Sequence, residues 1–128
     1  MKKTLWFGRI LSALSILFLL FDAAGHLVKP APVVDAFNRL NFPLSLSVPL
    51  GIIGFVCVIV YAIPRTSVLG AILLTGYLGG AVATHFRVRD PLFDTIFPII
   101  FGALVWGGVY FRDARLRALI PFAASVSN

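Results

Sequence analysis

Charged residues are scarce in this chain, and cysteine occurs once. Charged residues make up 12% of the 128 residues and hydrophobic residues 59%, whereas a soluble domain carries about 25% charged residues. Lipid is therefore the expected solvent, and we expect one domain over residues 1–128 because no polar segment is long enough to fold by itself. The single cysteine, Cys57, excludes an internal disulfide and a Cys-x-x-Cys redox pair, and we expect it to be a packing residue.

Motifs of common enzyme classes are also missing. The sequence has no phosphate-binding loop, nucleophile elbow or zinc-protease motif. No charged residue lies near the middle of an apolar stretch, which argues against a channel or pump built from this chain alone. Asp22, His26 and His85 are candidate ligands for a metal, and the two histidines are candidate ligands for haem. Both histidines are expected at helix ends, however, and no Cys-x-x-Cys-His site is present, so we expect neither cofactor.

What fills the chain is four long apolar stretches, at residues 5–21, 46–63, 67–86 and 92–111. A transmembrane helix needs about 20 mostly apolar residues. The first helix is expected to continue to about residue 25 and to be an uncleaved span, because its apolar run exceeds a usual signal-peptide core. The sequence therefore predicts an all-α, polytopic membrane protein with a bundle of four transmembrane helices.

Basic residues flank these spans and predict their orientation. One side of the membrane would hold seven lysines and arginines and one aspartate, and the other side four and four. Positive loops stay in the cytoplasm, so both termini are expected there. The flanking pattern also argues against nucleic-acid binding by this basic chain. Five candidate site residues then gather at the outer boundary: Asp22, His26, His85, Arg87 and Asp94.

The first span carries a stripe of small and polar residues at helical spacing. Such stripes face other helices, because small residues allow close approach and polar groups avoid lipid. Asp22 and His26 are one turn apart on it, so a carboxylate–imidazole contact is expected. The pair is either a proton-exchanging or ligand-binding dyad or a polar helix end among the headgroups. The stripe comprises Gly8, Ser12, Ser15, Leu19, Asp22 and His26.

The segment between the first two spans predicts a short amphipathic helix. Val33, Phe37 and Leu40 share one face at helical spacing. Asn41 suits a left-handed cap, and Pro43 ends the segment. We expect this helix to lie at the outer interface, where it would either cover the bundle as a lid or face solvent.

The last two spans add further expectations. Gly76 and Gly80 form a small-x-x-x-small pair, which favours a close helix crossing within the bundle or in a dimer. His85 lies on the opposite side of that helix, either in a pocket or in a structural contact. Asp90 is expected to cap the last span, and Asp94 to pair with Arg87 or Arg89. The tail at 112–120 alternates basic and apolar residues and is expected to lie on the cytoplasmic surface.

Several runs resemble the DoxX-like family of small bacterial four-helix membrane proteins. They are LGGAVATHFR at 78–87, DPLF at 90–93, Trp106 with the Arg112-Asp113 ending, and the loop at 29–43. The family's name derives from a subunit associated with a thiosulfate–quinone oxidoreductase. The resemblance therefore implies a bacterial inner-membrane location and a membrane redox partner.

The leading functional hypothesis is an accessory protein without catalytic activity of its own. Its outer pocket would bind a small lipophile such as a quinone or lipid, with polar contacts from Asp22, His26 and His85 and with Phe37 and Leu40 as a cover. One alternative is a subunit of a quinone-linked oxidoreductase complex, in which His26 or His85 relays protons. The other is a structural homodimer that is held by Gly76 and Gly80.

Overall fold

Four long helices make up most of the molecule. The computed structural model describes residues 2–123 and 125. The long helices are α1 (Lys2–Val28), α3 (Ser47–Ala62), α4 (Ser67–Arg87) and α5 (Leu92–Arg112). Two short 3-10 helices, η1 (Leu44–Leu46) and η2 (Pro64–Thr66), lead directly into α3 and α4. With these extensions, each of the four helices is long and apolar enough to cross a membrane. The predicted all-α fold with four spans is confirmed.

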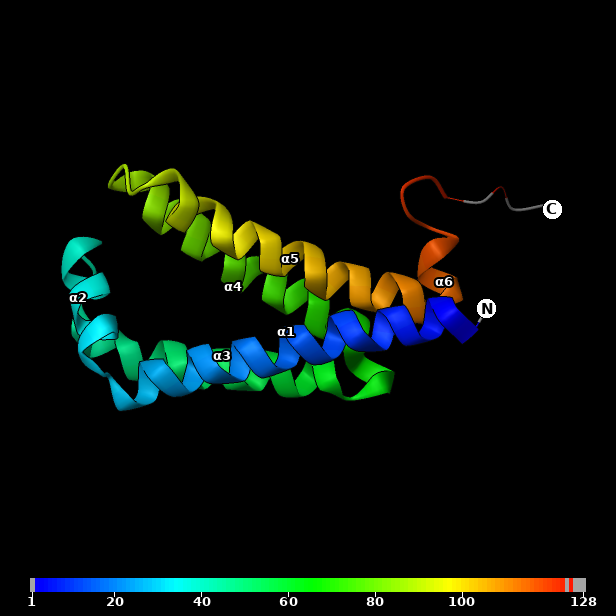
Figure 1. The fold of residues 1–128 in the computed structure, drawn as a ribbon, viewed down its shortest axis with the longest axis horizontal. Coiled ribbons are helices and arrows are strands. Elements are labelled where there is room, and N and C mark those ends of the chain that lie inside the picture. Colours follow the sequence, from blue (N-terminus) through cyan, green and yellow to red (C-terminus); the bar gives the residue numbers. More distant parts are fainter. Residues whose placement is uncertain (1, 124, 126–128) are drawn as a thin grey trace.

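The four helices form a ring in which each packs against two others. Helix α1 contacts α3 and α5, and α4 contacts the same two helices. Figure 1 shows two layers, α1 with α3 and α4 with α5, which lie close where α1 begins and move apart toward the other end. Helix α6 (Ala114–Arg117) lies at the closed end and buries Leu116 against the core, so this part of the predicted surface tail packs on the bundle.

The predicted interfacial helix is present. Helix α2 (Ala31–Arg39) lies at the open end of the bundle (Figure 1). Phe37 and Leu40, from the predicted apolar face, are buried. Asn41 has a φ of 53°, which is the left-handed conformation expected of a cap.

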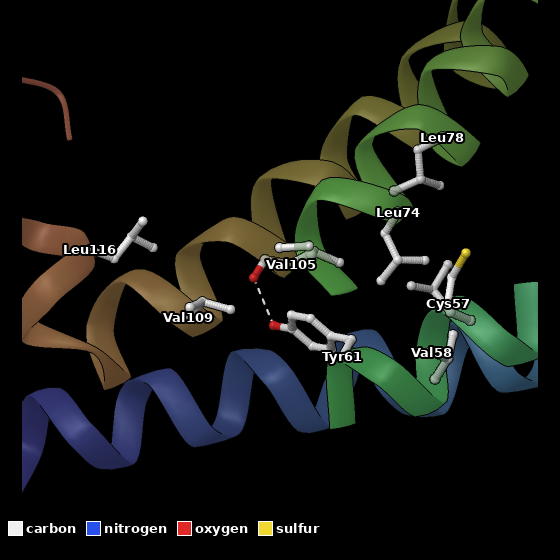
Figure 2. Packing of buried hydrophobic residues seen from close by; sticks show 10 residues of the cluster. Cys57, Val58, Tyr61, Leu74, Leu78, Val105, Val109 and Leu116 are labelled. Atoms are coloured by element: carbon white, nitrogen blue, oxygen red, sulfur yellow. Dashed lines mark hydrogen bonds between the residues drawn. The ribbon is translucent and has the colours of Figure 1, made fainter. Parts of the chain in front are cut away.

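Tyr61 of α3 joins all four long helices. Its side chain is completely buried, and its hydroxyl donates to the Val105 carbonyl of α5 at 2.7 Å (Figure 2) and lies 2.9 Å from Ser12 Oγ of α1. On its other side, the Tyr61 backbone lies directly against Gly70 of α4. The predicted packing stripe of α1 is buried from Gly8 through Leu19, because it faces this junction.

The glycines that permit close helix crossings are not the predicted pair. Gly70 faces the Tyr61 backbone, and Gly108 of α5 faces Ser12 and the Tyr61 hydroxyl. Gly76 and Gly80 have no neighbouring atom within 4 Å of where a side chain would begin. The prediction of a close crossing at Gly76 and Gly80 is therefore wrong for the bundle, because no other helix comes close to α4 at these two positions.

The Gly70→Ala variant tests the junction. An added methyl group would overlap the Tyr61 backbone, which cannot move like a side-chain end, so we expect a loss of unfolding free energy of about 1–3 kcal/mol or more. The measurement is unfolding in detergent followed by circular dichroism. Gly79→Ala is the control, because Gly79 faces open space. Equal stability of the two variants would contradict the proposed packing.

Candidate functional site

A cavity of about 590 Å³ lies between the two helix layers at the α2 end. All five helices from α1 to α5 contribute to its wall. Five of the six site residues predicted from the sequence line it, namely Asp22, His26, Phe37, His85 and Asp94. The topology therefore brings residues from α1, α2, α4 and α5 to one space.

The cavity has an aromatic wall. The Phe18 and Phe101 rings are stacked with centroids 3.9 Å apart and 12° between their planes, and Phe97 meets both rings edge-on at 5.4 and 5.1 Å. Helix α4 contributes two residues without side chains, Gly76 and Gly80, which also border the cavity. The absence of side chains at these two positions is what leaves this part of the space open.

Helix α1 supplies a carboxylate and an imidazole. The Asp22 Oδ2 atom lies 3.4 Å from His26 Nε2, as the one-turn spacing predicts. The His26 ring also packs edge-on against Phe37, and its Nδ1 atom is buried with no hydrogen-bond partner among the described residues. Buried polar atoms are normally satisfied, so water or a bound molecule is expected to complete this group.

Tyr77 is a cavity residue that the sequence reasoning missed. It lines the cavity, and its hydroxyl lies near the Asp22 carboxylate. Its spacing from Gly80, Ala81 and Thr84, which also line the cavity, is that of one helix face. This spacing is the feature of the sequence that could have identified Tyr77 as a neighbour of the other α4 residues in the cavity.

A second polar cluster fixes α2 to the turn between α4 and α5. Arg39 donates from Nε to Asp90 Oδ1 at 2.8 Å, and His85 Nδ1 lies 2.6 Å from Asp90 Oδ2. Arg87 donates to the Leu40 carbonyl at 3.0 Å. We call Arg39, His85, Arg87 and Asp90 the α2 latch. The Arg39 hydrogen bond, with a smaller contribution from His85, holds the pKa of Asp90 below its usual 3.8 against the opposing effect of burial.

The latch corrects two predictions, the partner of Asp94 and the cap of α5, and it gives the contact that Arg87 makes. Asp94 lies 4.0 Å from Arg39 instead of pairing with Arg87 or Arg89, because α2 ends beside it. The Asp90 carboxylate binds Arg39 and His85, and α5 has no side-chain cap. Arg87, the sixth predicted site residue, holds the end of α2.

His85 does lie in the cavity, together with Gly76 and Gly80. The helical wheel predicts it on the opposite side of α4 from these glycines. A wide part of the α4 surface borders the cavity, so both sides of the wheel contribute. The described residues contain no group of three or more His, Cys, Asp or Glu side chains that could hold a metal ion.

The comparison with protein-family models decides the family. The model of the DoxX-like family matches residues 10–108. The chain belongs to the DoxX-like family. Together with its four apolar helices, this makes it a multi-pass membrane protein.

The match of this DoxX-like protein includes every residue that lines the cavity, from Phe18 to Phe101. The cavity is thus built within the part of the chain that defines the family. No curated protein and no solved structure matches the chain.

The latch makes a prediction for hydrogen exchange. In Arg39→Gln, the Asp90 contact is lost, so amides of α2 should exchange up to about fivefold faster at neutral pH, as expected for loss of an ion pair whose arginine is half-exposed. Hydrogen–deuterium exchange with mass spectrometry measures this. Arg89→Gln is the control, because it removes one positive charge from the turn between α4 and α5, to which Arg39 binds.

The wild type and Arg39→Gln should also differ in how the exchange of the α2 amides depends on pH. Because the pKa of Asp90 is lowered below 3.8, the contact is complete above that value and is lost as the pH falls through the lowered pKa. The ratio of variant to wild-type exchange should therefore fall toward one in acid below about pH 4. A ratio near one at neutral pH, or one equal to that of Arg89→Gln, would contradict the latch.

Proposed function

We propose that this DoxX-like protein binds a small amphipathic lipophile, such as a quinone or lipid, in the cavity beneath α2. The observation that carries the proposal is the convergence of Asp22, His26, His85 and Asp94 on one cavity with an aromatic wall. Ligand pockets are about 300–1,000 Å³, mostly apolar, with a few convergent polar groups. The cavity of about 590 Å³ lies within that range.

The position of the polar groups suggests how the ligand lies. Asp22 and His26 belong to the last two turns of α1, whereas Phe18 lies a turn deeper, and Phe101 lies deep in α5. An apolar tail would therefore contact the phenylalanines while a polar head lies near Asp22 and His85. Phe37 of α2 lines the cavity beside His26 and would cover the head.

The charge distribution of the loops supports an orientation for this site. By the positive-inside rule, the arginine- and lysine-rich terminal end faces the cytoplasm and the α2 end faces outward. In the bacterial inner membrane, the cavity would then take its ligand from the outer leaflet or the periplasm.

Both alternatives make distinct demands. A subunit of a quinone-linked oxidoreductase complex requires the bound lipophile to be a quinone and requires a membrane partner that reduces or oxidises it. A structural dimer through Gly76 and Gly80 would place a second copy against these two exposed residues, which also border the cavity. Such a dimer requires self-association, whereas the proposed function requires a bound ligand.

The Gly80→Leu variant tests the proposal. Gly80 borders the cavity and has no atom within 4 Å of where a side chain would begin, so a leucine at this position has room to fill part of the cavity. We expect bound decylubiquinone and co-purified lipid to fall by about tenfold per protein, a loss of about 1.4 kcal/mol in binding. Mass spectrometry of solvent extracts from protein in non-ionic detergent measures both.

Gly79→Leu is the matched control. Gly79 also faces open space, but it does not border the cavity. Its ligand content should equal that of the wild type. If the two leucine variants retain the same ligands in the same amounts, the cavity is not the binding site.

A further inference from the structure

The cavity has the opposite charge to the rest of the chain. The protein carries a formal charge of +6 with histidines counted as neutral. Within residues 2–123 and 125, no lysine or arginine lines the cavity, whereas Asp22 and Asp94 do. A cavity with two carboxylates in so basic a protein is not explained by the average composition of the chain.

Asp22 is the carboxylate that is left to meet a ligand. Asp90 is bound by Arg39, Asp94 lies 4.0 Å from the same guanidinium, and Asp113 is paired with Arg115. Among the described residues, the ion contact of Asp22 is with His26 alone, and 40% of its side chain remains accessible. It therefore lines the cavity without a lysine or arginine to balance its charge.

From this arrangement we propose that the ligand is a lipophilic organic cation, an amine or another onium compound, with Asp22 as its counter-ion. The inference rests on the proposed function, since it names the class of lipophile that the cavity binds. A cation would be attracted to Asp22, and an anion of equal size would be repelled by it.

The aromatic wall supports the same sign of charge. The faces of aromatic rings attract cations. Phe18 and Phe101 cover one face of each other by stacking, and both rings line the cavity together with Phe97. The apolar surroundings also weaken dielectric screening, which strengthens the attraction between a cation and Asp22. Shape and charge thus favour one class of molecule.

Two ions of nearly the same shape and opposite charge test the proposal. Tetraphenylphosphonium and tetraphenylborate are titrated against the full chain in non-ionic detergent, with decylubiquinone as a neutral probe. Binding to the cavity is the part that Gly80→Leu removes and Gly79→Leu keeps. We expect tetraphenylphosphonium to bind at least about tenfold more tightly than tetraphenylborate.

Aspartate variants then locate the charge. Asp22→Asn should weaken tetraphenylphosphonium binding about tenfold, a larger loss than for decylubiquinone, because the quinone has no charge to pair with the carboxylate. Asp35→Asn is the matched control, because Asp35 is an exposed residue of α2 that does not line the cavity. It should bind both probes like the wild type.

The outcomes separate the two proposals. Cavity binding of decylubiquinone without a preference for tetraphenylphosphonium over tetraphenylborate overturns the cation proposal and leaves lipophile binding standing. An Asp22→Asn effect no larger than that of Asp35→Asn overturns the role of Asp22 and with it the cation proposal. If Gly80→Leu changes the binding of none of the three probes, both proposals fail.

Discussion

The architecture depends on one buried contact, in which Tyr61 binds Ser12 and the Val105 carbonyl while its backbone lies against Gly70. Lipid tails are as apolar as leucine, so helices in a membrane gain little from burying apolar surface and associate through close packing and hydrogen bonds. Tyr61 provides both kinds of contact to three helices at once. The four helices are thereby held together at the end of the bundle where α1 begins, and the two layers are free to separate toward α2.

The separation of the layers creates the cavity and determines its chemistry. Close to the junction, the wall consists of phenylalanines and of glycines that leave the space unfilled. Farther out, the ends of α1 and α4 bring in Asp22 and His85. Helix α2 crosses this end, and the Arg39–Asp90 pair holds it to the turn between α4 and α5. His85 both lines the cavity and contacts Asp90, so it connects the proposed ligand to the latch that holds the cover.

Much of the fold could be predicted from the sequence, and less of the site. The four spans, the short helix with Asn41 as its left-handed cap, and the stripe on α1 follow from length, periodicity and backbone preference, which are local properties. The roles of Tyr61, Gly76 and Asp94 depend on which helices meet and at what level. Hydrophobic spans leave this open, because every face of such a helix is compatible with lipid. Loop charges placed Asp22 and His85 at the same boundary, but the partner of Asp94 required the position of α2.

An experimental structure in lipid nanodiscs would show whether the bundle that is joined at Tyr61 holds a ligand in the cavity beneath α2. We expect α1 and α4 to contact the same elongated density, which extends from Phe18 and Phe101 to the Asp22 carboxylate. A structure in which the two helix layers pack against each other over their full length, with α2 away from the bundle and no space beside Gly80, would contradict this expectation.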